Sequence, residues 1–232
     1  MAKMKYVFED RIAQITLDDG KVNVMNWEFF NELTTSLDQA LADKAAAVIF
    51  TSRPGVFSAG LDLKLMMTQT LPELLKFQRA FADIMLRLYL FPIPTIAAYS
   101  GHSIAGGAIL SFACDRLMVV DGPYKVQINE VANKMILPTW IYTICCSSIP
   151  QRFWKEAMLH AHIYTPREAF EKGIIDDLIA EGGDVVALAK TYAQDLFKLD
   201  PKAYGATKKI MRQKEADYAL EVFEKEILGW LL

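Results

Sequence analysis

A serine set between small residues is the first group in this sequence that could do chemistry. Residues 101–105 read Gly-His-Ser-Ile-Ala, close to the G-x-S-x-G turn that exposes a nucleophilic serine between a strand and a helix. Residues 94–99 could form that strand and residues 106–112 that helix. The chemistry would be acyl transfer through Ser103, provided that a histidine stands beside it as a base.

The histidines give this serine little support. In an α/β-hydrolase the chain order is serine, acid, histidine, but only His160 and His162 follow Ser103, and residues 163–232 contain none. The two histidines are two positions apart, so on a helix they would point to different faces, which also argues against a metal pair. We predict that both are ordinary surface or packing residues, expect no metal site, and keep the hydrolase as a distant alternative.

Two segments that contain glycines carry a stronger signal. Residues 57–64 read FSAGLDLK and residues 100–115 read SGHSIAGGAILSFACD. With these two segments at this separation, the chain resembles the crotonase (enoyl-CoA hydratase/isomerase) superfamily over residues 4–210. The likeness continues through residues 129–131 and 165–169. Either segment alone could be a tight turn and nothing more, but the two together are specific.

The resemblance implies a site that stabilises a thioester enolate. Its donors would be the backbone N–H groups of Leu61 and Gly106, the second where a helix begins, and fixed donors of this kind need no reorganisation during reaction. A carbonyl group could approach Gly106 closely because no Cβ stands in the way. The resemblance places five further residues around the coenzyme A thioester, and these are Ala59, Gly60, Lys64, Gly107 and Ile109.

Two positions indicate which reaction the site performs. Hydratases of the superfamily use two glutamates, and the first of their positions is occupied here by Ile109, which cannot act as a base. The second matches Glu130, and this arrangement resembles the mitochondrial type of 3,2-trans-enoyl-CoA isomerase, in which one glutamate serves. The resemblance therefore implies isomerisation of 3-enoyl-CoA to 2-trans-enoyl-CoA. The alternatives are another crotonase reaction (hydration, thioester hydrolysis or decarboxylation) and a catalytically idle acyl-CoA-binding subunit.

The surroundings of Glu130 bear on this role. An apolar setting would raise the pKa of its carboxyl group toward the range useful for general acid–base work. The sequence departs from the family pattern at Gln127, where relatives commonly have glycine, and at Asn133 and Lys134, which replace an apolar residue and a glycine. These departures could redirect the acyl pocket. The apolar residues near the glutamate are Ile128, Val131, Ile136 and Leu137.

Other side chains have weaker claims to the site. We predict that His102 and Ser103 pack in a loop or line the acyl pocket, and that Asp62 satisfies backbone groups around Leu61. Three lysines could meet a CoA phosphate, although solvated surface lysines are the default, and these are Lys64, Lys208 and Lys209. Apolar residues that could line an acyl pocket, or simply pack in the core, are Met66, Met67, Phe77, Phe81 and Met85.

The elements that must position these residues follow from the hydrophobic pattern. Alternation and buried apolar runs predict strands at 6–8, 12–17, 45–51, 95–99, 115–120, 124–128 and 174–180. Helical spacing and capping residues predict helices at 27–41, 73–90, 106–113 and 165–173, with two or three more between 184 and 232. The order indicates a mixed α/β fold. The resemblance implies a crotonase-like spiral of strand-strand-helix units over 1–180, with a helical C-terminal region at 181–232 of the same domain.

Composition excludes several classes of function. The 232 residues carry a net charge of -3 without a basic stripe, which argues against nucleic acid binding. The three cysteines form no disulfide or zinc pattern, and we find neither a targeting segment nor a membrane-spanning stretch, so we expect a cytoplasmic protein. The resemblance implies that no cofactor is required beyond the coenzyme A of the substrate. It also implies that the C-terminal helices build a homotrimer or homohexamer.

Overall fold

The computed structural model describes residues 3–231 and is built from pairs of strands that are each followed by a helix. The first unit consists of β1 (Met4–Glu9), β2 (Ile12–Leu17) and α1 (Trp27–Ala42). The second consists of β3 (Ala47–Ser52), β4 (Gly55–Ser58), the short α2 (Leu63–Met66) and α3 (Leu71–Tyr89). The third consists of β5 (Thr95–Tyr99), β6 (Gly101–Ile104) and α4 (Gly106–Ala113). The fourth consists of β7 (Arg116–Val120), β8 (Val126–Gln127), a 3₁₀ turn η1 (Val131–Asn133) and α5 (Thr139–Ser148).

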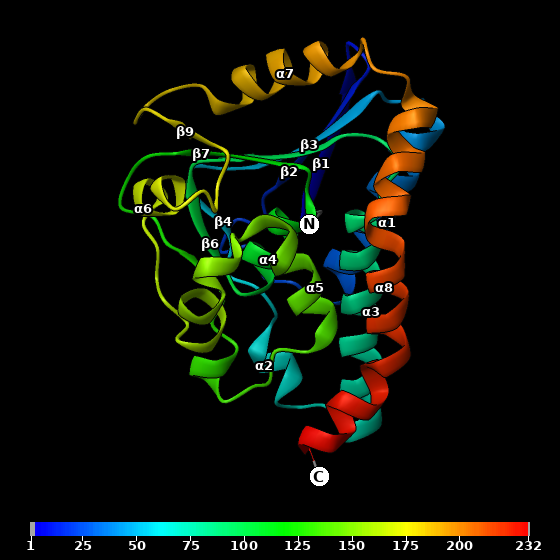
Figure 1. Ribbon diagram of the computed structural model, residues 1–232, viewed down its shortest axis with the longest axis vertical. Helices are drawn as coiled ribbons and strands as arrows, with labels where there is room; N and C mark the ends of the chain where they lie inside the picture. Colours follow the sequence, from blue (N-terminus) through cyan, green and yellow to red (C-terminus); the bar gives the residue numbers. More distant parts are fainter. Residues whose placement is uncertain (1–2, 232) are drawn as a thin grey trace.

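The remaining elements cover this core. They are η2 (Gln151–Phe153), the π-helix η3 (Lys155–Leu159), α6 (Pro166–Glu171), β9 (Asp177–Ile179), α7 (Val185–Leu196) and α8 (Pro201–Leu231). Figure 1 shows the long α8 along one side of the molecule next to α3, with α7 crossing at the opposite end from the C-terminus. None of the helices over residues 3–231 combines the length and the apolar composition that crossing a membrane would require.

The strands of each unit divide between two sheets. The large sheet has the order β1-β2-β3-β5-β7-β9 and the small sheet the order β4-β6-β8. Within the described chain β1 and β2 pair antiparallel, and the other neighbours in both sheets pair parallel. Because the carboxyl ends of parallel strands meet at one edge, the turns that follow β4 and β6 leave the small sheet side by side.

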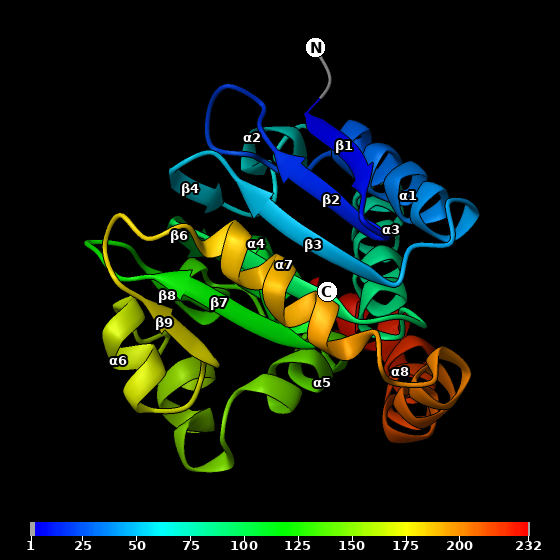
Figure 2. The same cartoon turned by 90° about the horizontal axis from the view of Figure 1, so that it is seen from above.

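Both faces of the large sheet are buried at its central strands β3, β5 and β7, as is typical of parallel sheets. Along β3, Val48 and Phe50 face the main core, whereas Ala47 and Ile49 face the cluster completed by α7. Figure 2 shows α7 lying over this face of the sheet. The main core also receives one face of α3, and the large side chains of that face are Phe77, Phe81 and Met85.

The predicted strands and helices are confirmed, with shifts of a few residues at their ends. Two strands were missed, β4 and β6, which are four residues long and lie in segments that the sequence predicts as turns. The prediction of a loop at His102 and Ser103 is therefore wrong, since both residues belong to β6.

A buried charge cluster fixes α8 to the rest of the fold. Lys208 is only 5% exposed, donates to the carbonyl oxygen of Ile93 at 2.9 Å and pairs with Asp115. The guanidinium of Arg212 lies 2.9 Å from the other carboxylate oxygen of Asp115. The sequence predicts Lys208 at the surface or at a CoA phosphate, and the structure contradicts both interpretations. A lysine this deeply buried needs a counter-charge, which Asp115 supplies.

Candidate active site

Two glycine turns cross at the edge of the small sheet. Gly60, in the turn after β4, has φ +86°, and a Cβ there would lie 2.8 Å from the nitrogen of Gly106. A Cβ on Gly107 would lie 2.3 Å from the carbonyl oxygen of Ser58. Both positions therefore require glycine, and the close approach brings the backbone of one turn against the start of α4.

The first turn leaves one backbone N–H free. Met25 donates to the carbonyl oxygen of Gly60 at 2.9 Å and accepts from the N–H of Asp62 at 3.0 Å. These two hydrogen bonds pair Met25 with Leu61 as in a parallel sheet, and they use the residues on either side of Leu61. The N–H of Leu61 therefore points away from Met25. Asp62 has the structural role that the sequence predicts, because its carboxylate accepts from the N–H of Leu65 and caps α2.

The second turn presents another free N–H group. Gly106 is the first residue of α4, and the first N–H groups of an α-helix have no partner within the helix. Ala105 precedes it at φ 50° and ψ -121°, a conformation that a non-glycine residue adopts only when its surroundings enforce it. One enforcing contact is the hydrogen bond from its N–H to the carbonyl oxygen of Gln127, at 2.9 Å.

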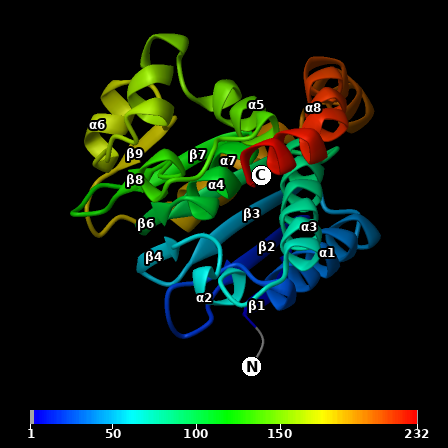
Figure 3. The same cartoon turned by 90° about the horizontal axis from the view of Figure 1, so that it is seen from below.

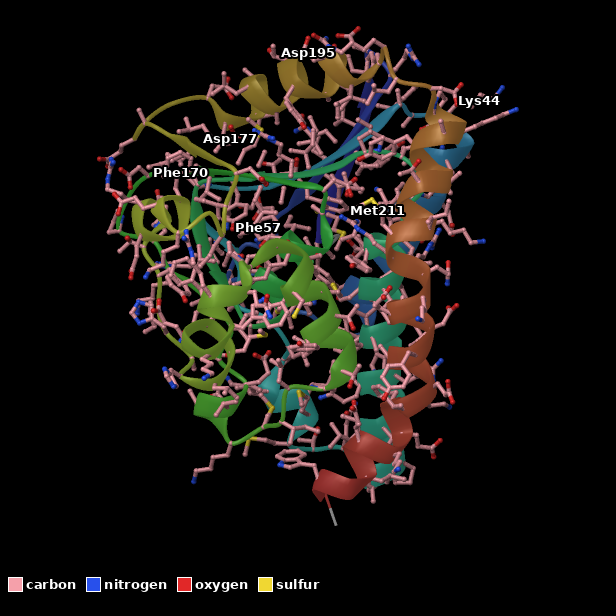
Figure 4. The ribbon with its side chains drawn as sticks, viewed as in Figure 1. Lys44, Phe57, Phe170, Asp177, Asp195 and Met211 are labelled. Carbon is pink, nitrogen blue, oxygen red and sulfur yellow. The ribbon has the colours of Figure 1, made fainter. Side chains whose placement is uncertain are left out.

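Phe57 helps to hold the crossing in place. Its ring stacks on Tyr99 with centroids 4.3 Å apart, and neither side chain is exposed. Figure 4 shows Phe57 in the interior, close to α4. The strand that ends at the first turn is thereby packed directly on β5 of the large sheet, so the position of the turn is fixed by the core.

Both turns open into an apolar cavity of about 400 Å³, a size typical of ligand pockets. The residues that line it from the two turns are Ala59, Leu61, Ala105 and Gly106. Those from α2, α3 and their flanks are Leu63, Met66, Met67, Leu74, Gln78 and Phe81. The loop after β8 and α5 contributes Asn129, Glu130, Asn133, Met135, Ile136, Pro138 and Ile141, and α8 contributes Ile227 and Trp230.

Glu130 is the only titratable side chain of the described residues that lines this cavity. It is 6% exposed, and its Oε2 atom has no hydrogen-bond partner. Burial raises the pKa of Glu130 to about 7, and the backbone N–H groups of Glu130 and Asn129 oppose the shift only in part. The structure thus confirms the apolar setting expected for this carboxyl group and places it in one cavity with the N–H groups of Leu61 and Gly106.

Other predicted site residues fall outside the cavity. Gly60 and Gly107 shape the crossing without lining the cavity. Ile109 is fully buried in the core, and Lys64 is exposed on α2. Neither residue lines the cavity, and their expected contact with the CoA thioester stays a prediction. Among the apolar candidates, Met66, Met67 and Phe81 line the cavity, whereas Phe77 and Met85 belong to the core alone.

The departures near Glu130 also have defined places. The side chain of Gln127 donates to the carbonyl oxygen of Ala161 at 2.8 Å, away from the cavity. Lys134 is exposed and ends η1 in a left-handed conformation, with φ 58°, so the residue that replaces glycine still adopts a glycine-like backbone. Asn133 lines the cavity and donates to the carbonyl oxygen of Asn129 at 3.0 Å.

Neither His102 nor Ser103 takes part in the cavity. The ring of His102 accepts from the N–H of Lys125 at 3.1 Å. Ser103 is fully buried within β6, paired on both sides by β4 and β8. A nucleophile must reach its substrate, so the structure contradicts the hydrolase alternative.

A second group of ionisable side chains lies around η3. Glu156, His162 and Glu168 bring ligand-type atoms within 4.8 Å of one another. His162 already hydrogen-bonds Glu168 at 3.0 Å, and Lys172 lies 3.2 Å from Glu156. His162 and Lys172 are therefore the partners of the two carboxylates, and this place among neighbouring side chains agrees with the packing role that the sequence predicts for His162.

Several of the cavity residues that the sequence did not identify come from distant parts of the chain. Ile141 lies on α5, and Ile227 and Trp230 lie at the end of α8, about a hundred residues after Glu130. Both helices pack against α3, which carries Phe81 of the cavity wall. Hydrophobic spacing identifies such residues as buried, but it does not tell which cavity they face.

A spiral of strand-strand-helix units, with ligand-facing turns at the carboxyl edge of the smaller sheet, is the crotonase fold. The sequence profile of the enoyl-CoA hydratase/isomerase family matches residues 7–227, and the chain belongs to this family. It is 31% identical over 222 residues to enoyl-CoA delta isomerase 1, mitochondrial, of Rattus norvegicus, covering 94% of this chain and 76% of that protein.

Two further relatives show the range of the family. A putative enoyl-CoA hydratase of Thermus thermophilus is 29% identical over 213 residues, covering 90% of this chain and 83% of that protein. The crystal structure of human mitochondrial delta3-delta2-enoyl-CoA isomerase superposes with a TM-score of 0.92 at 28% identity, covering 98% of this chain and 90% of that one. Both hydratases and isomerases are therefore among the proteins that this chain resembles.

Proposed function

We propose that this protein isomerises 3-enoyl-CoA thioesters to 2-trans-enoyl-CoA with Glu130 as its single base. The observation that carries the proposal is the solitary carboxyl group of Glu130, which shares an apolar cavity with the free N–H groups of Leu61 and Gly106. Ile109, at the position of a second glutamate in hydratases, offers no base. The isomerases from rat and human named above support this choice of reaction.

In the proposed reaction the thioester oxygen accepts hydrogen bonds from the N–H groups of Leu61 and Gly106. The carboxylate of Glu130 removes a proton from C2, and the electron pair of that C–H bond moves toward the oxygen to give a dienolate. The protonated Glu130 then returns the same proton to C4. The double bond moves from C3–C4 to C2–C3, and the glutamate ends as it began.

The surroundings suit both halves of this cycle. Donors that are fixed before the reaction stabilise the charge that develops on the oxygen, and one such donor contributes about 10²- to 10³-fold in rate. The N-terminus of α4 adds its dipole at Gly106. A pKa of about 7 for Glu130 lets the group exist in both protonation states near neutral pH, which a base that becomes an acid requires.

The test is incubation of the purified protein with a 3-enoyl-CoA in the absence of other enzymes. We expect the double bond to become conjugated with the thioester carbonyl group, which ultraviolet absorbance detects. The mass of the thioester should not change. Glu130→Gln should lower the rate by about 10²- to 10⁴-fold, whereas Glu171→Gln, at an exposed position on α6, should leave it unchanged.

Other outcomes would redirect the function. A mass gain of one water would indicate hydration, and release of free CoA would indicate thioester hydrolysis. Thermal stabilisation by acyl-CoA without turnover, unchanged in Glu130→Gln, would indicate an idle binding subunit. Full isomerase activity in Glu130→Gln would refute Glu130 as the base.

The compartment and the oligomeric state of the protein are two further predictions that experiment can test. The rat relative is named as a mitochondrial protein, so fractionation of cells that express the full chain should decide between that compartment and the predicted cytoplasm. Sedimentation of the purified protein should distinguish the predicted homotrimer from the homohexamer.

A further inference from the structure

The end of α8 is anchored close to the cavity by one side chain. The carboxylate of Glu226 accepts from the backbone N–H of Thr139 at 2.9 Å and from its hydroxyl group. Thr139 is the first residue of α5, so Glu226 supplies a partner for an N–H that the helix itself leaves free. The adjacent Ile227 is 6% exposed and belongs to the main core. The helix is therefore held firmly up to Ile227.

The last turn of α8 is held differently. A Cβ at Gly229 would meet no atom within 4 Å, so packing gives no reason for glycine there. Glycine inside a helix costs about 1 kcal/mol relative to alanine, which weakens this turn. The next residue, Trp230, is 43% exposed and lines the cavity together with Ile227. Figure 3 shows the end of α8 beside α3 and α5.

The cavity that Trp230 borders is suited to a hydrocarbon chain. The side chains that line it from α2, α3, α5 and α8 are apolar except for Gln78. Among the described residues that line it there is no lysine, arginine or histidine, so a negatively charged acyl substituent would find no partner. Apart from Gln78, the polar groups of the wall are those of the two turns and of Asn129, Glu130 and Asn133.

We propose that Trp230 closes the apolar end of this cavity and thereby sets the longest acyl chain that the protein binds fully. The inference rests on the proposed function in one respect, namely that the thioester lies at the N–H groups of Leu61 and Gly106. The acyl chain then runs away from Glu130 between Met66, Phe81 and Ile141 until it meets the indole. The weakened last turn lets the indole move aside while the chain enters.

The test measures the affinity of the full chain for a series of saturated acyl-CoA thioesters of increasing length. Each added methylene that is buried should raise the affinity about fourfold, until the chain reaches Trp230 and the affinity levels off. In Trp230→Ala the plateau should begin at longer chains, and in Trp230→Phe at an intermediate length. Tyr218→Ala, an exposed aromatic on the same helix outside the cavity, should keep the wild-type plateau.

The results separate this inference from the proposed reaction. Saturated thioesters have no double bond to move, so their binding is measured whether or not the protein is an isomerase. Circular dichroism should show that Trp230→Ala retains its fold. If its affinity then levels off at the same chain length as that of the wild type, Trp230 does not set the longest acyl chain. Conjugation of 3-enoyl-CoA by that same variant, measured in a separate assay, would leave the isomerase proposal standing. A shifted plateau without conjugation by the wild type would leave only the chain-length inference standing.

Discussion

Replacing Glu130 by glutamine should make the folded protein more stable above neutral pH while removing its proposed base. Burial raises the pKa of Glu130 from 4.5 to about 7, and unfolding returns the group to water. At low pH the carboxyl group is protonated in both states, so the wild type then has its full stability. As the pH rises the unfolded state ionises first, so the free energy of unfolding falls, and the loss is complete once the pH exceeds the folded-state pKa.

The size of this loss follows from the two pKa values of the group. A difference of one pKa unit corresponds to about 1.4 kcal/mol, so the shift of Glu130 from 4.5 to about 7 costs the wild type about 3 kcal/mol at high pH. Glutamine has the shape of the protonated carboxyl group and does not titrate. We expect Glu130→Gln and the wild type to be equally stable at about pH 4, and the variant to be more stable by about 3 kcal/mol at about pH 8.

Urea unfolding followed by circular dichroism across this pH range is the appropriate assay. Protein concentration should be fixed, since an oligomer would make the midpoint depend on it. The exposed Glu171 provides the control, because Glu171→Gln should follow the wild type at every pH. A difference between Glu130→Gln and the wild type that stays constant with pH would refute the reasoning. So would a variant that is less stable than the wild type at high pH.

Three further predictions concern the same molecule. The kcat/KM for 3-enoyl-CoA should rise with pH and level off above about 7, because Glu130 must be ionised to accept a proton, and a flat pH–rate profile would count against it. Gly60→Ala should lower that activity by at least about 10²-fold, since its Cβ would clash with the start of α4. Gly20→Ala, also at positive φ but in open space, should retain activity. An equal loss of activity in Gly60→Ala and Gly20→Ala would show that the clash is unimportant. Asp115→Ala should lower the free energy of unfolding by about 3–5 kcal/mol in urea, because it leaves two cations without their counter-charge; an unchanged midpoint would contradict this.

Much of the fold could be predicted because its elements have clear periodicity. The helices α1 and α3 repeat apolar residues at helical spacing, and β2 alternates. The strands β4 and β6 could not be found in this way. They are short, and residues such as Gly101 and His102 lack the β-branched or aromatic character typical of strands. They form because each pairs with its neighbours in a parallel sheet, an interaction between distant segments.

The candidate site was predictable to a similar degree. The apolar residues around Glu130 indicated its burial, and the family resemblance carried by the two glycine motifs implied the N–H groups of Leu61 and Gly106 as donors. The burial of Lys208 could not be predicted, because its partner Asp115 lies almost a hundred residues earlier. Trp230 was missed for the same physical reason, since only tertiary packing brings the end of α8 to the cavity.

The crossing of the two glycine turns also determines which positions of such a protein can change during evolution and in redesign. An N–H group belongs to the backbone, and every residue except proline carries one. Any substitution at position 61 or 106 other than proline therefore keeps the donor itself. Evolution must preserve the room at Gly60, Gly106 and Gly107, because a Cβ at any of these positions would lie less than 3.0 Å from a neighbouring atom. Libraries that hold these three glycines constant and vary the rest of the cavity wall should therefore yield many folded proteins with altered ligand preference and few in which the site is lost.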